Sequence, residues 1–188
     1  LTRLMQGFFF ADLHELPTTN SISGVAGTTF GIADIETGAI INVDANDGAK
    51  FLPGMLLRST GMANVVNNLL VEITGVATDE LTLDTTALVA DGSPAGTLEV
   101  VGFEFATGDA ELDLTNNVFQ LTTTAQSLTD LNIQVGEWIF IGGDNADEYF
   151  STGLMGYARV EAVAANALTL KEPTFTPLTN NGSGKTIR

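Results

Sequence analysis

The sequence has no cysteine, one histidine, one tryptophan and few positive charges, and each shortage excludes a class of protein. Without cysteine the chain forms no disulfide, no thiolate metal site and no cysteine nucleophile. A single histidine, His14, does not supply a two-histidine metal motif. Seven Lys and Arg stand against 23 Asp and Glu, and this formal net charge of −16 argues against binding to nucleic acid or to an anionic membrane surface.

Long apolar runs are also missing. About 20 apolar residues are needed to cross a bilayer as a helix, and the tightest run here is Trp138–Ile141. The apolar stretch at residues 1–10 is interrupted by polar residues and runs into Asp12, so we predict a strand there rather than a signal peptide. Because the sequence starts at Leu1, we expect it to be part of a longer protein.

What is present favours a folded β protein. The chain is 44% hydrophobic and 16% charged, which is too apolar and too lightly charged for a disordered segment. Its 20 glycines favour a turn-rich all-β architecture over a helical bundle.

Two segments of the chain repeat each other. Residues 71–84 align without a gap with residues 158–171, and five of the fourteen positions are identical where about one is expected by chance. Upstream of each copy a glycine precedes an apolar strand, Gly54 in the first copy and Gly136 in the second. The repeat therefore predicts two related small β-sandwich or barrel units that arose by internal duplication.

Each unit is predicted to contain the same elements. An apolar strand (39–43 or 118–122) is followed by a short turn (47–52 or 127–131), the glycine-led strand, and a hairpin that ends in Leu-Thr-Leu. The alternation of that motif predicts burial of its leucines, so Leu81 and Leu83 are expected to be buried where Leu168 and Leu170 are.

The turn-forming stretch at residues 91–96 is taken as the boundary between the units, before an alternating strand at 98–105. The predicted organisation is an entry strand and linker at residues 1–20, a first β-unit at 21–96 and a second at 97–188.

Two sequence motifs invite a ligand-binding interpretation and fail it. Residues 182–186 read Gly-Ser-Gly-Lys-Thr, like the end of a phosphate-binding loop, but Thr179 stands where that motif begins with glycine, and only two residues follow Thr186. The stretch 44–48 begins like a calcium loop, but its glycine comes one position early and Met55 replaces the closing glutamate. Both are predicted to be turns.

Residues 142–148 gather three carboxylates, which are cation ligands in some proteins but here are expected to keep an acidic surface solvated. His14 is interpreted as a surface or junction residue, because no Gly-x-Ser-x-Gly motif offers it a nucleophile. We predict no catalytic, cofactor-binding or metal-ligating residues.

The aromatic residues raise two further questions. Trp138 lies in a run that is apolar at every position, so it is predicted to be a core residue rather than a platform for stacking a ligand. Phe8, Phe9 and Phe10 are consecutive, so as a strand they point to both faces. Either an intramolecular core or a neighbouring domain or subunit would cover them.

Several of these segments, in their order and spacing, resemble the major tail tube proteins of long, non-contractile-tailed bacteriophages. The resemblance covers nearly the whole chain, with these segments: residues 6–12 (QGFFFAD), 61–68 (GMANVVNN), 101–110 (VGFEFATGDA), 134–144 (QVGEWIFIGGD), 156–163 (GYARVEAV), 167–170 (ALTL) and 184–187 (GKTI).

The resemblance implies a structural virion protein of the phage tail, made in the host cytoplasm, whose partners are other copies of the tube subunit. Family members continue beyond both ends of this chain, so it corresponds to a middle region that projects from a tube wall. The segment 7–11 and the segment 185–188 are then expected to lie side by side, and this region alone is expected to be monomeric. The alternative is a surface binding or adhesion β-module without catalysis, which needs an exposed aromatic platform.

Overall fold

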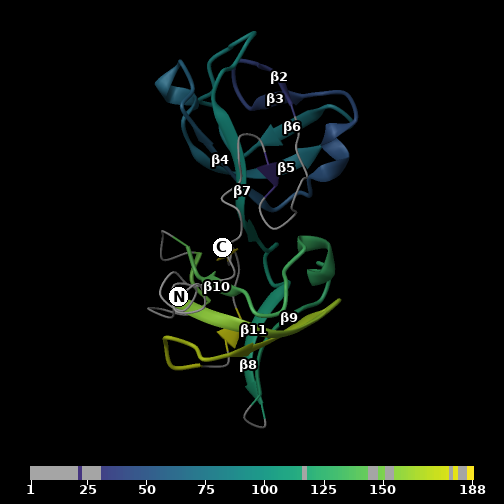
Figure 1. The fold of residues 1–188 in the computed structure, drawn as a ribbon, viewed down its shortest axis with the longest axis vertical. Coiled ribbons are helices and arrows are strands. Elements are labelled where there is room, and N and C mark those ends of the chain that lie inside the picture. The colour runs from purple at the N-terminus through teal and green to yellow at the C-terminus, as the bar shows by residue number, and fades with distance from the viewer. Residues whose placement is uncertain are drawn as a thin grey trace, which may run out of the picture. The chain divides into compact units, whose positions relative to one another are not determined.

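The computed structural model describes residues 21–22, 31–115, 118–143, 148–150, 155–177, 180–181 and 186–188 (Figure 1). These residues form an all-β fold, so the predicted fold class is confirmed at that level. The pairs among β2–β6 and among β8–β14 are antiparallel, and β14 pairs with β7 in the same way, whereas β1 pairs with β7 in parallel. They contain no α-helix, and no helix among them has the length and apolar character needed to span a membrane.

The chain divides into two compact units. We call them the N-terminal unit, which ends at Gly102, and the C-terminal unit, which begins at Phe103. The boundary lies inside strand β7 (Thr97–Glu104), six residues after the position expected from the sequence. The predicted seam at 91–96 belongs to the N-terminal unit because Asp91 exchanges both backbone hydrogen bonds with Ile35, at 2.8 and 2.9 Å.

The N-terminal unit has the strand order β7-β4-β5-β6-β3-β2. Two short 3₁₀ turns connect its strands, η1 (Asp47–Lys50) after β3 and η2 (Val65–Asn67) after β4. The bounds are β1 Ser21–Ile22, β2 Ile32–Ile35, β3 Ile40–Val43, β4 Met55–Thr60, β5 Leu70–Val76 and β6 Glu80–Leu83.

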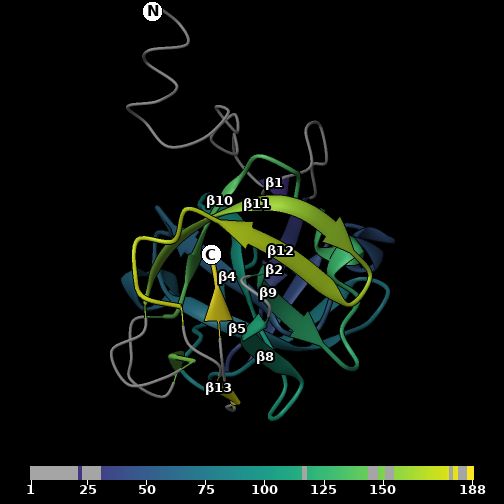
Figure 2. The same ribbon diagram turned by 90° about the horizontal axis from the view of Figure 1, so that it is seen from below.

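The C-terminal unit has the order β14-β10-β11-β12-β9-β8-β13, and Figure 2 shows the long β11–β12 hairpin. The turn η3 (Leu128–Leu131) follows β9, as η1 follows β3. The bounds are β8 Ala110–Thr115, β9 Val118–Thr123, β10 Trp138–Ile141, β11 Gly156–Ala164, β12 Ala167–Lys171, β13 Asn180–Asn181 and β14 Thr186–Ile187.

The hairpins β5–β6 and β11–β12 have the same register. Each carries an irregularity at the same place, between Ile73 and Gly75 in β5 and between Val160 and Ala162 in β11. Residues that are aligned in the sequence repeat therefore hold equivalent positions in the two hairpins. The paired residues are Ile73 with Leu83, Gly75 with Thr82 and Val76 with Leu81, and correspondingly Val160 with Leu170, Ala162 with Thr169 and Val163 with Leu168.

The two glycines singled out by the sequence occupy equivalent turns in the two units, as predicted. Gly54 has φ 96° and Gly136 has φ 99°, a backbone conformation that favours glycine. The Gly54 N–H donates to the carbonyl of Ile73 at 2.8 Å, and the Gly136 N–H donates to the carbonyl of Val160 at 2.8 Å.

The core of each unit contains the predicted leucines. Leu81 and Leu168 have no exposed surface, and Leu83 and Leu170 are each 3% exposed, so the predicted pairing of buried positions is confirmed. The two leucines of each motif point to the same face of their strand and are buried there, whereas the threonine between them points to the opposite face and is half-buried.

One buried hydroxyl group in the C-terminal unit has no hydrogen-bond partner. Thr186 of β14 is completely buried and its Oγ1 atom is unpaired. Replacing Thr186 with valine removes the unpaired hydroxyl and keeps the shape, so we expect Thr186→Val to raise the free energy of unfolding by about 1 kcal/mol. Urea denaturation checks this. Thr97→Val, at a half-buried position where β7 begins, is the control and should change little.

A candidate functional surface on the C-terminal unit

The carboxylates of the acidic stretches either bind other groups of the protein or lie outside the described residues. Asp47, in the stretch 44–48, accepts a hydrogen bond from the Gly31 N–H at 2.9 Å and pairs with the Lys50 ammonium at 2.5 Å. The hydrogen bond from Lys50 and that from Gly31 lower the pKa of Asp47, against a smaller opposing effect of burial. Among the described residues, no three Asp, Glu or His side chains gather as a metal site.

The remaining sequence candidates give little information about a site. Several of them lie outside the described residues: Phe8–Phe10, the segment 7–11, His14, residues 144–147 and residues 182–185. Thr186, which would end a phosphate loop, begins a strand instead of a helix. Glu148, at the end of the acidic stretch, faces the guanidinium of Arg188 at 3.7 Å.

Trp138 corrects the prediction that it is a core residue. In β10, Ile139 and Ile141 are buried, whereas Trp138 and Phe140 are half-buried. Successive strand residues point to opposite faces, so the two isoleucines face the core and the two aromatic residues lie on the outer face. The prediction was wrong because four consecutive apolar residues suggested a strand covered on both sides.

Strand β11 completes an aromatic surface beside Trp138. Trp138 pairs directly with Arg159, and Phe140 pairs directly with Tyr157, so all four side chains lie on one face of the sheet. The rings of Phe140 and Tyr157 meet edge to face with centroids 5.2 Å apart, and Tyr157 is 45% exposed. We call Trp138, Phe140, Tyr157 and Arg159 the aromatic face.

Positive charges surround the aromatic face. Arg188 exchanges backbone hydrogen bonds with Phe140, at 2.6 and 2.8 Å. Lys171 of β12 lies directly opposite Arg159 of β11. With Arg159, this border contains three of the chain's seven Lys and Arg. Two of the three are engaged in ion pairs: Lys171 with Glu161, and Arg188 with Glu148.

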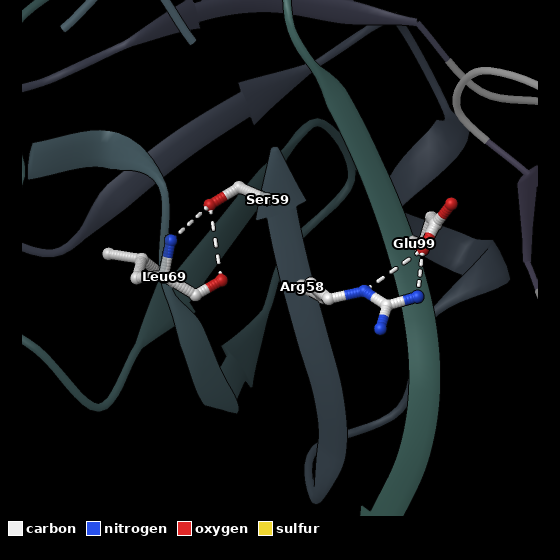
Figure 3. A network of polar contacts seen from close by, with 4 residues as sticks. All are labelled: Arg58, Ser59, Leu69 and Glu99. Atoms are coloured by element: carbon white, nitrogen blue, oxygen red, sulfur yellow. Dashed lines mark hydrogen bonds and ion pairs between the residues drawn. The ribbon is translucent and has the colours of Figure 1, made fainter. Parts of the chain in front are cut away.

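The N-terminal unit has different residues at the corresponding positions. By the shared register, Leu56 replaces Trp138, Arg58 replaces Phe140, Leu70 replaces Tyr157 and Glu72 replaces Arg159. Figure 3 shows that Arg58 binds Glu99 of β7, with Nη2 2.5 Å and Nε 3.1 Å from Oε2. The N-terminal unit thus has an ion pair where the C-terminal unit has aromatic rings.

The aromatic face offers groups that can bind a ligand. Its three rings offer flat apolar area with polar edges at Trp138 and Tyr157, and Arg159 adds hydrogen-bond donors.

Neither a protein-family model nor a curated protein sequence matches this chain. The resemblance to phage tail tube proteins therefore stays a prediction.

Fluorescence of Trp138, the single tryptophan, tests its placement. We expect acrylamide to quench it to a degree between that of a free indole and that of a buried one, because the side chain is half-buried. We expect Arg159→Glu to reduce quenching by iodide by about twofold, since a negative charge opposite the indole repels that anion. Acrylamide quenching should stay unchanged. An indole inaccessible to acrylamide would contradict the placement.

Proposed function

We propose that this chain is a structural virion protein, part of the tail tube of a long, non-contractile-tailed phage. In this proposal it forms an outward-projecting β region of the tube subunit, its partners are other copies of that subunit, and it has no enzymatic activity. The segments that resemble tail tube proteins support this, and so does the use of polar side chains within the fold.

The buried polar groups with hydrogen bonds hold backbone segments in place, and this observation carries the proposal. The Ser59 hydroxyl binds the backbone of Leu69, accepting from its N–H at 2.9 Å (Figure 3). The Asn67 side chain both donates to and accepts from the backbone of Val89, at 2.9 Å each. The Thr123 hydroxyl donates to the carbonyl of Gln126 at 2.6 Å. Such groups serve rigidity, which a building block needs, and leave no reactive constellation in the described residues.

We infer further that the two units are small β-sandwiches or barrels derived by duplication. The equal strand orders, the shared hairpin irregularity and the matching glycine turns support common descent. The segment 88–91 pairs with β2 before the chain enters β7, and β13 pairs with β8 before the chain enters β14. In each unit the chain thus passes from one edge of the sheet to the opposite edge, which favours closure of the sheet into a sandwich or barrel.

Electron microscopy tests the tail tube assignment. We expect the full-length protein to form tubes, and an antibody against the C-terminal unit to label phage tails along their length. The matched control is the same antibody preincubated with this chain, which should abolish labelling. A full-length protein that stays monomeric, together with unlabelled virions, would refute the proposal.

A further inference from the structure

We propose that copies of this chain bind one another through two equivalent hairpins: Glu72 and Asp84 of the β5–β6 hairpin in one copy contact Arg159 and Lys171 of the β11–β12 hairpin in the next. We call Glu72 and Asp84 the acidic pair, and Arg159 and Lys171 the basic pair. This inference deepens the tail tube proposal by naming a surface through which copies meet, and it rests on that proposal only for what holds the copies close together.

Each hairpin places two like charges directly opposite each other. In the β11–β12 hairpin, Arg159 of one strand pairs with Lys171 of the other. In the β5–β6 hairpin, the shared register places Glu72 opposite Asp84, and the Asp84 N–H donates to the Glu72 carbonyl at 2.9 Å. Like charges that face each other on neighbouring strands destabilise a sheet. Neither pair therefore helps to fold the unit that contains it.

The two pairs hold the same place and carry opposite signs. The sequence repeat aligns Glu72 with Arg159 and Asp84 with Lys171, on hairpins of equal register. Asp84, Arg159 and Lys171 are exposed, and Glu72 is half-buried. Because the charges are equally spaced on both hairpins, each charge of one pair can face an opposite charge of the other. Such complementarity selects a partner and sets its orientation.

Little of this charge is neutralised within one copy. Among the described residues, the acidic pair and Arg159 take part in no ion pair, and Lys171 binds Glu161 while its own side chain stays 56% exposed. Burial and, less strongly, the neighbouring Asp84 carboxylate raise the pKa of Glu72. A cation brought by another copy favours the charged form of Glu72, so binding offsets the repulsion within the acidic pair.

A second copy is the partner that both pairs fit. A foreign polyanion is repelled by the net charge of −16, and a foreign cation would occupy the acidic pair and leave the basic pair without a role. A second copy uses both pairs. Because the two surfaces differ, the contact is head-to-tail and continues from copy to copy, as a repetitive assembly requires.

The contact is expected to be weak by itself. Exposed ion pairs contribute little individually, and the net charge opposes association, so we expect a dissociation constant on the order of 1 mM. The chain is then monomeric in dilute solution. The contact forms where an assembly holds neighbouring copies at a high effective concentration.

Reversal of the charges in both pairs tests the proposal. One variant, Arg159→Glu with Lys171→Glu, carries two acidic pairs, and the other, Glu72→Arg with Asp84→Lys, carries two basic pairs. In sedimentation equilibrium at about 1 mM chain, we expect the wild type to self-associate and each variant alone to lose more than about tenfold in association constant. An equimolar mixture of the two variants should associate as the wild type does, because both of its contacts are again complementary.

Two controls separate this contact from a general effect of charge. The variants change the net charge by equal and opposite amounts, so their mixture keeps the wild-type average. Asp79→Lys with Asp130→Arg changes the net charge as much as reversal of the acidic pair does, at two exposed positions outside both pairs, and should associate at least as strongly as the wild type. Circular dichroism melting verifies folding. Should Glu72→Arg not fold, the single reversals at exposed positions, Asp84→Lys and Arg159→Glu, repeat the test.

Three results would overturn the proposal. A wild type that is monomeric at this concentration does not form the contact. Folded variants that associate alone as the wild type does show that the contact lies elsewhere. A mixture that stays monomeric while the wild type associates shows that the two pairs do not face each other. Electron microscopy of the full-length protein is a separate test: tubes without association of this chain refute this inference alone, and association of this chain without tubes or labelled tails refutes the tail tube proposal alone.

Discussion

Replacement of Leu168 by alanine is expected to lower the free energy of unfolding by about 2–5 kcal/mol. Leu168 has no exposed surface, and it pairs with Val163 on one side and with Leu121 of β9 on the other. Neighbours on two strands cannot collapse into the space that the side chain leaves, so the variant loses the transfer free energy of the removed atoms and retains a cavity. Leu81→Ala should cost a similar amount, because Leu81 holds the equivalent place between Val76 and Ile41.

Urea denaturation measures both losses. The fluorescence of Trp138 reports on the C-terminal unit, and circular dichroism reports on the whole chain. Thr169→Ala is the control for Leu168→Ala, because Thr169 is half-buried on the same strand and should cost less than about 1 kcal/mol. If either leucine variant lost as little as its threonine neighbour, that leucine would not belong to a packed core.

Replacement of Asp109 by asparagine is expected to lower the free energy of unfolding by about 2–3 kcal/mol at neutral pH. The Asp109 carboxylate accepts four hydrogen bonds, from the backbone N–H groups of Thr124, Ala125 and Gln126 and from the Thr124 hydroxyl. An amide offers one acceptor oxygen in place of two, and its NH₂ group meets N–H donors. Hydrogen bonds to a charged acceptor are also stronger than those to a neutral one.

The effect of this substitution depends on pH. Burial alone raises the pKa of Asp109, but the hydrogen bonds from Ala125, Thr124 and Gln126 together outweigh it and lower that pKa. A carboxyl group whose pKa is lower in the folded than in the unfolded chain stabilises the fold above its unfolded value, about 3.9, and loses this contribution as the pH falls through its folded value. The difference between wild type and Asp109→Asn should therefore be full at pH 7 and shrink below about pH 4.

Urea titrations of both proteins at pH 7, 5 and 3 measure this. Asp113→Asn, a substitution in strand β8 at a position that is only half-buried, is the control and should shift stability by less than about 1 kcal/mol. A difference between wild type and Asp109→Asn that stayed constant down to pH 3 would show that the carboxylate is not what fixes this turn.

The sequence predicted the repeated hairpins well because they carry strong local signals. The identical Leu-Thr-Leu motifs and the positive-φ glycines, Gly54 and Gly136, constrain pairing and turns within a few residues. Strand β8 was missed, although Glu111-Leu112-Asp113-Leu114 alternates clearly, because the adjoining strand at 98–105 was taken as the start of the unit. Strand β2 was also missed, because it is only four residues long; it pairs with the neighbouring strand β3 and, at Ile35, with Asp91, a contact over 56 residues that no local pattern indicates.

The aromatic face was only partly predictable. Tyr157-Ala158-Arg159-Val160 alternates large polar-edged residues with small apolar ones, so the outward direction of Tyr157 and Arg159 was available from the sequence. That Trp138 shares their face depends on the register of β10 against β11, and these strands are separated by a 14-residue connection. The anchoring role of Asp109 was missed for a similar reason: its partners follow strand β9, on the far side of a hairpin.

The common register of the two units has a consequence for folding. While the chain refolds, the β11–β12 hairpin encounters two gaps of matching register, its own between β9 and β10 and another between β3 and β4. Chains with repeated domains characteristically misassemble by such exchanges. The residues that border each gap oppose the exchange, because Arg159 would then face Leu56 in place of Trp138. Synthesis on the ribosome avoids the competition, since β2 to β7 are complete before β11 has been made.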